Sequence, residues 1–217
     1  MNISQTQRLH QNKKLLLTST VILLCLLLSA FFPTDNAVET ISRSLIFLIA
    51  LPLLYIKLIL KNNISLWGWN LQNKKSGLIW GLLAFLLGAV IFYPLTHWTV
   101  FVQNYSIDPL VASSFWFFVL YELVFFNIFF FAQTFFYQGF AIYAFRRFGA
   151  WSIAIQAGIY FAVLGLSGSF TWQSAPLIFW ALAGGFAAYK SRSFAYSYIF
   201  GLSFIIMLDA WMIHLVK

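Results

Sequence analysis

Charged side chains are scarce in this sequence, and their scarcity limits the classes of protein it can be. Only 8% of the 217 residues are Asp, Glu, Lys or Arg, whereas 62% are hydrophobic and 21% are aromatic. Soluble globular chains have roughly a quarter charged and about half apolar residues. The composition therefore excludes an ordinary soluble domain, a disordered chain and a nucleic-acid-binding protein, and it predicts a lipid bilayer as the surroundings.

Cysteine and histidine are also rare. The single cysteine, Cys25, lies inside an apolar run, so a disulfide within the chain is excluded. The three histidines, His10, His97 and His214, lie near the N-terminus or at the ends of apolar segments. No His, Cys or carboxylate pairs occur at metal-ligand spacing on one predicted helix, so we expect no metal site and no cofactor.

Long apolar segments are abundant. A helix that crosses a bilayer needs about 20 mostly apolar residues. The seven segments that reach or approach this length are Leu15–Phe32, Ile41–Leu60, Gly77–Leu95, Leu110–Phe131, Ala150–Leu166, Pro176–Tyr189 and Phe194–Val216. They predict an all-α fold, a polytopic membrane bundle of about seven transmembrane helices. We expect the fourth helix to continue to Arg147, because no proline or turn signal interrupts it.

The few charges alternate between the two sides of the predicted membrane. One side has eleven basic residues, namely Arg8, Lys13, Lys14, Lys57, Lys61, Lys74, Lys75, Arg146, Arg147, Lys190 and Arg192. The other side has Asp35, Glu39, Arg43, Asp108 and Lys217. Because basic loops remain in the cytoplasm, this pattern predicts a cytoplasmic N-terminus and an exterior C-terminus.

The first apolar segment has a second interpretation, a signal peptide cleaved after Leu28-Ser29-Ala30. Its apolar stretch is long for a signal peptide, so we expect it to be retained as a helix.

Small residues recur at helical spacing on two segments, as Gly77, Gly81, Ala84 and Gly88 and as Ala181, Gly184 and Ala188. Such stripes let helices approach closely, and we expect them to pack within one chain. A homodimer seam is the alternative, and the sequence leaves the oligomeric state open.

Several polar side chains fall at membrane depth, where they are costly and often mark a cavity. On the fourth helix, Glu122 and Gln133 share one face at 100° per residue, and a second row contains Asn127, Thr134 and Gln138. The fifth and seventh helices add Gln156 and Asp209. One interpretation is a polar cavity among the three helices. The other, which we prefer for the amides, is interhelical hydrogen bonding that stabilises the packing.

The segment QTFFYQGFAIYAFRRFGAWSIAIQAGIYFAVLGL, residues 133–166, is followed later by GGFAAYKSRSFAYSYIFGLSFIIMLD, residues 184–209, and preceded by SLWGWNLQNKKSGLIWGLL, residues 65–83. In order and spacing these segments resemble the CPBP family, the CAAX proteases and bacteriocin-processing (Abi-like) proteins. The resemblance covers about half of the chain. It implies an intramembrane endopeptidase fold in a bacterial cytoplasmic (inner) membrane. On this basis we divide the chain into N-terminal helices (1–109) with a basic cytoplasmic linker (61–76), and a CPBP-like core (110–217) of four spans.

The residues that carry the family's chemistry are replaced. Its two glutamates correspond to Gln133 and Thr134, its arginine to Gln138, its two histidines to Gly165 and Gly201, and its asparagine to Ile205. Amides and threonine cannot act as general bases near neutral pH, and glycine has no side chain to stabilise an oxyanion. The resemblance therefore implies a catalytically inactive relative, which binds or regulates a peptide or a membrane-protein partner.

Three alternatives remain. Glu122 and Asp209 can serve as displaced catalytic carboxylates of an active peptidase, although we expect them at different depths, with Glu122 near mid-membrane and Asp209 nearer the exterior. The polar stripe of the fourth helix can belong to a small transport or permeation component, although no internal repeat supports this. The glycine stripes can also bind a purely structural subunit to a fixed partner.

Overall fold

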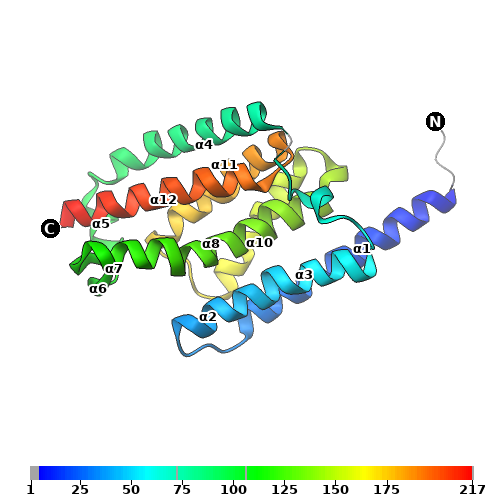
Figure 1. Ribbon diagram of the computed structural model, residues 1–217, viewed down its shortest axis with the longest axis horizontal. Helices are drawn as coiled ribbons and strands as arrows, with labels where there is room; N and C mark the ends of the chain where they lie inside the picture. Colours follow the sequence, from blue (N-terminus) through cyan, green and yellow to red (C-terminus); the bar gives the residue numbers. More distant parts are fainter. Residues whose placement is uncertain (1–4, 72, 106, 217) are drawn as a thin grey trace.

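The computed structural model describes residues 5–71, 73–105 and 107–216, and all regular secondary structure in these ranges is helical. The side chains of Arg8 and His10, and the whole of Lys217, lie outside the described part. The longer helices run side by side, and α4 and α12 lie nearly parallel along one side of the bundle (Figure 1). The all-α class is thereby confirmed for the described residues.

Five helices are long and apolar enough to cross a membrane, as expected for an integral membrane protein. They are Gln11–Phe31 within α1 (Gln5–Phe31), Val38–Ile59, α4 (Lys74–Leu95), Phe115–Ala144, and Phe194–Leu215 within α12 (Phe194–Val216). The fifth and sixth predicted spans are also helices, α10 (Trp151–Leu166) and α11 (Ala175–Ser191). With 16 and 17 residues, they are shorter than the other five.

Two of the long helices contain π-helical turns. The second consists of α2 (Ala37–Ser44), η1 (Leu45–Ala50), α3 (Leu51–Leu54) and η2 (Tyr55–Ile59). The fourth consists of α7 (Phe115–Leu120), η4 (Tyr121–Phe126), α8 (Asn127–Thr134), η5 (Phe135–Ala141) and α9 (Ile142–Ala144). The short connecting elements are η3 (Ile64–Trp67), α5 (Thr99–Asn104), α6 (Pro109–Ser113), η6 (Arg146–Phe148) and η7 (Trp172–Ser174).

The fourth long helix begins later than predicted. The sequence placed its start at Leu110, but residues 109–113 form the separate helix α6, which the Asp108 side chain caps by accepting from the Leu110 amide. Ser114 then adopts an extended conformation, with φ −140° and ψ 134°, which ends α6 before the long helix starts at Phe115. Consequently Glu122 lies only two turns from the start of this helix.

The glycine stripes pack within the chain, as expected. A methyl group at Gly77 or Gly81 would come within 2.2 Å of the ring of Tyr196 or Phe200 on α12. The stripe of α11 is buried as well, because this helix packs against α4, α10 and α12. Two hydrophobic clusters form the core, and each combines residues from both 1–109 and 110–217.

Basic residues gather at one end of the bundle. The Arg147 guanidinium donates to Asn12 near the start of α1, and Asn70 in the linker donates to the backbone oxygen of Arg192. Ser76 donates to the backbone oxygen of Lys190. Hydrogen bonds thus join the linker to the turn between α11 and α12, at the end opposite Asp108.

Candidate functional site: an acidic pocket, a hydroxyl pocket and a closed core

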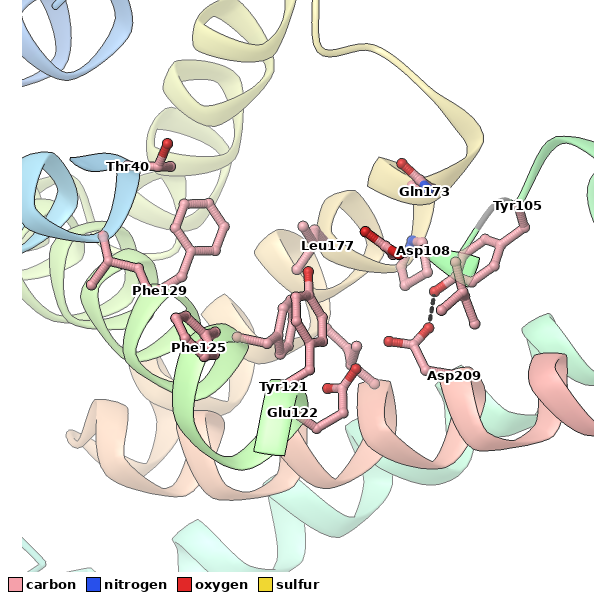
Figure 2. A pocket seen from close by; sticks show the side chains of 15 residues that line it. Thr40, Tyr105, Asp108, Tyr121, Glu122, Phe125, Phe129, Gln173, Leu177 and Asp209 are labelled. Carbon is pink, nitrogen blue, oxygen red and sulfur yellow. Dashed lines mark hydrogen bonds between the residues drawn. The ribbon is translucent and has the colours of Figure 1, made fainter. Parts of the chain in front are cut away.

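A pocket of about 450 Å³ lies between the start of the fourth long helix, the end of α12 and the loops beside them. We call it the acidic pocket, because Asp108, Glu122 and Asp209 line it and no Lys, Arg or His does. In Figure 2 the side chains of Glu122 and Asp209 reach into the same space from two different helices.

This meeting corrects the sequence interpretation, which placed the two carboxylates at different depths. The fourth long helix starts at Phe115 and runs without interruption to Ala144, so Glu122 lies near its N-terminal end and not at its middle. Asp209 lies near the end of the antiparallel helix α12. The two carboxylates therefore come to the same end of the bundle.

The two carboxyl groups differ in their hydrogen bonds. Asp209 accepts one from a neighbouring hydroxyl, whereas one oxygen of Glu122 has no hydrogen-bond partner among the described residues. The Tyr105 hydroxyl donates to Asp209 Oδ1 at 2.5 Å, as the dashed line in Figure 2 marks. Burial and the Asp209 carboxylate raise the pKa of Tyr105 well above its ordinary value, so this hydroxyl remains a donor at neutral pH. Glu122 is only 2% exposed, and its Oε2 atom has no hydrogen-bond partner among the described residues.

Aromatic rings form a large part of the remaining wall of the acidic pocket. They belong to Tyr105, Tyr121, Phe125, Phe126 and Phe129. All but Tyr105 come from the first four turns of the fourth long helix, where the sequence is rich in phenylalanine. The site therefore combines negative charge with aromatic faces.

A second pocket, of about 410 Å³, adjoins the first, and Phe129, Gln173 and Leu177 line both. We call it the hydroxyl pocket, because its polar lining is mostly serine, threonine and tyrosine, with Arg43 and Gln133. The hydroxyl of Tyr160 faces this region, and it is buried without a hydrogen-bond partner in the described structure. Gln133 is therefore the one motif-equivalent residue that lines this pocket.

Gln138 of η5 and Gly201 of α12 lie in a closed core around Trp180. Gln138 donates to the Trp180 carbonyl oxygen at 3.0 Å and accepts from the Ser197 hydroxyl. The Trp180 indole donates to the Ser197 carbonyl oxygen at 3.0 Å. The free space beside Gln133, Thr134 and Gln138 is about 20 Å³. That volume is enough for a single water molecule and far too small for a peptide.

The glycines at the family's histidine positions have opposite surroundings. A Cβ atom at Gly201 would lie 2.2 Å from the Trp180 indole nitrogen, whereas one at Gly165 would meet no atom within 4 Å. Gly165 is exposed near the end of α10, so it does not reach the core. Ile205, one turn beyond Gly201, lines the acidic pocket instead. The motif-equivalent positions thus converge only in part.

The other amides join helices. Gln156 on α10 donates to the Ala181 carbonyl oxygen of α11, and Tyr198 on α12 donates to Asn127 Oδ1 of α8. The structure therefore contains no single polar cavity that joins the predicted polar residues of the three helices, because they fall into three separate places. The fourth long helix also contains the π-helical turns η4 and η5, in which the spacing of faces departs from the uniform 100° per residue that the sequence interpretation assumed.

Tyr105, Tyr121, Tyr160 and Arg43 were missed from the sequence. Tyr105 follows the short helix α5 in a segment with no helical periodicity, and only its proximity to Asp209 makes it part of a site. Tyr121 directly precedes Glu122, and that adjacency was the one available signal. No group of three or more His, Cys, Asp or Glu side chains that could hold a metal ion occurs among the described residues.

Comparisons of the chain with protein-family models, curated proteins and solved structures find no match.

Proposed function

We propose that this chain is a catalytically inactive relative of the CPBP intramembrane peptidases that binds a peptide segment of a membrane-protein partner. The observation that carries the proposal is the closed Trp180 core. Gln138, at the family's arginine position, hydrogen-bonds to Trp180 and Ser197 there, beside a void of about 20 Å³ that Gln133 and Thr134 also line. A substrate peptide and an attacking water do not fit together in that space. The order of the motif segments supports the relationship.

The proposal includes seven spans in a bacterial cytoplasmic membrane. The short helices α10 and α11 are the two spans that bring the five long helices to seven. Helix α11 packs against α4, α10 and α12. The basic end, with Arg147, Lys190 and Arg192, faces the cytoplasm, and the acidic pocket faces the exterior. With seven spans, the N-terminus is cytoplasmic and the C-terminus is exterior.

The hydroxyl pocket is the place where the partner segment binds. Its serine, threonine and tyrosine hydroxyls, with Gln133, offer donors and acceptors to a peptide backbone. The pocket has the size of a site for a few side chains and not for a whole helix.

Photocrosslinking tests this proposal. A benzoylphenylalanine at Val163, which lines the hydroxyl pocket, is expected to capture a peptide or protein in the native membrane. The same probe at Leu87, an exposed residue of α4, should capture only lipid. Replacement Gln133→Leu should reduce the Val163 adduct. Lipid adducts alone at both positions would overturn the proposal, as would an adduct that Gln133→Leu leaves unchanged.

An active peptidase with displaced carboxylates is the second candidate, and the meeting of Glu122 and Asp209 in one pocket favours it. Two carboxylates that share a water can divide the roles of general acid and general base. The test is cleavage of membrane-anchored peptides by the purified chain, followed by mass spectrometry. Activity lost in both Glu122→Gln and Asp209→Asn, but retained in Asp35→Asn, would establish this candidate and refute the inactive relative.

A further inference from the structure

We infer that the acidic pocket binds an organic cation, an ammonium group carried on an apolar or aromatic body. This inference goes beyond the proposed function, which concerns the hydroxyl pocket, and does not depend on it.

The first step of the argument is the meeting of two carboxylates without a basic partner. Glu122 and Asp209 reach into one space from separate helices, and no basic side chain lines the pocket. Carboxylates this deep in a membrane protein are costly unless a cation, a donor or a proton compensates them. Asp209 has the Tyr105 hydroxyl as a donor. The two carboxyl groups are also close enough to hydrogen-bond to each other, and none of the described lining side chains brings a positive charge to the pair.

The second step is the state of Glu122 itself. This side chain is only 2% exposed, and it lines the pocket. Its Oε2 atom has no hydrogen-bond partner among the described residues. A buried acceptor without a partner costs on the order of 1–3 kcal/mol, and more when it is charged. A cationic group in the pocket supplies positive charge to the two carboxylates that line it.

The third step is the aromatic wall, which selects the kind of cation. Tyr121, Phe125 and Phe129 line the same pocket as the carboxylates, and aromatic faces attract ammonium groups at short range. The same rings remove apolar surface of the ligand from water. A volume of about 450 Å³ lies within the range of small-molecule sites. The pocket therefore fits a cation that has an apolar body.

An inorganic ion fits the site less well. Calcium and magnesium need six or more oxygen ligands at short range. The described residues contain no group of three His, Cys, Asp or Glu that could hold a metal ion. One oxygen of the Asp108 carboxylate accepts from the Leu110 amide in capping α6, and the side chain adds negative potential to the pocket that it lines.

The test is titration calorimetry of the purified full chain in nonionic detergent with benzyltrimethylammonium. The control ligand is neopentylbenzene, which has the same shape with carbon in place of the charged nitrogen. We expect saturable binding of the cation and at least about tenfold weaker binding of the neutral compound. This comparison uses the unaltered protein and needs no variant to fold.

Variants locate the site. Glu122→Gln and Asp209→Asn should each weaken cation binding by at least about tenfold, whereas Asp35→Asn, an exposed carboxylate outside the pocket, should leave it unchanged. Phe125→Leu keeps the apolar surface and should weaken binding by a few-fold through loss of the aromatic face.

Three results would overturn the inference: equal affinity for the neutral compound, unchanged affinity in Glu122→Gln, or displacement of the probe by low concentrations of calcium or potassium. Because these variants lie outside the hydroxyl pocket, they leave the Val163 crosslink as a separate readout. Failure of cation binding is thereby distinguished from failure of the proposed partner binding.

Discussion

At the scale of single residues, the absence of a side chain has opposite consequences at two glycines. Gly201 lies against the Trp180 indole, and Trp180 is 1% exposed, so the space of a side chain at Gly201 is already occupied. Gly165 has nothing within 4 Å of a would-be Cβ. Identical residues at two motif positions therefore indicate a filled core at one and open space at the other.

This contrast predicts different effects of the same substitution. Gly201→Ala should destabilise the protein by about 1–3 kcal/mol, because the methyl group overpacks the Trp180 core. Gly165→Ala should be neutral or slightly stabilising, because alanine favours a helix more than glycine does. Reversible unfolding in mixed micelles measures both. A Gly201→Ala variant as stable as the parent would show that the core is not tightly packed.

Some residues of the site could be recognised from the sequence, and others could not. Gln133, Gln138 and Gln156 were recognised as deep polar groups by their chemistry, and the structure gives each a place near other polar groups. Tyr105 and Arg43 were not recognised, because tyrosine and arginine are common at membrane interfaces. Their roles follow from contacts with residues far away in the chain.

At the scale of elements, the packing of α4 on α12 depends on a row of small residues facing a row of rings. Gly77, Gly81 and Gly88 lie under Tyr196, Phe200 and Phe204 respectively. In lipid, helices gain little from hydrophobic burial against one another, so close van der Waals contact provides much of the association. The period of the stripe was visible in the sequence, whereas the identity of the facing helix was not.

A pair of substitutions on adjacent residues of α4 tests this packing. Gly81→Val should destabilise the protein by about 1–3 kcal/mol, because the side chain meets the Phe200 ring. Leu82→Val, at a position 47% exposed, should change stability by less than about 0.5 kcal/mol. Thermal unfolding in detergent provides the comparison, and equal effects would argue against a glycine-mediated contact.

The π-helical turns are the elements that sequence periodicity could not reveal. The stretches Tyr121–Phe126 and Phe135–Ala141 have no proline and one glycine between them. A uniform helix would have placed Glu122 and Gln133 on one face. In the structure η4 lies between the two residues, and Glu122 lines the acidic pocket whereas Gln133 lines the hydroxyl pocket.

At the scale of the whole molecule, charge is separated along the bundle. The linker, the end of α9 and the turn after α11 bring basic residues together at one end, and the acidic pocket lies at the other. Basic residues at one end are the pattern that orients membrane proteins, and the negative potential of the acidic end attracts cations. The proposed orientation in the membrane and the proposed positive charge of the ligand therefore both depend on this distribution of charged residues.

Cysteine accessibility tests the proposed orientation. A membrane-impermeant maleimide should label Asp35→Cys in intact cells and should label Lys190→Cys only after permeabilisation. Both positions are exposed, and the native Cys25 is 0% exposed, so it provides a silent background. Reversed labelling would contradict a cytoplasmic basic end.

The sequence by itself indicated a lipid bilayer as the surroundings, the all-α class and the positions of most of the helices. These features depend on the lengths of the apolar segments and on the charged residues between them. Phe194–Val216 was predicted with the ends that the structure has. The tertiary structure alone decided which polar groups meet. Glu122 and Asp209 lie 87 positions apart in the chain, and they share a pocket because one helix starts at Phe115 and its antiparallel neighbour ends near Asp209. Such a meeting depends on helix starts, π turns and packing partners, which composition and periodicity do not encode.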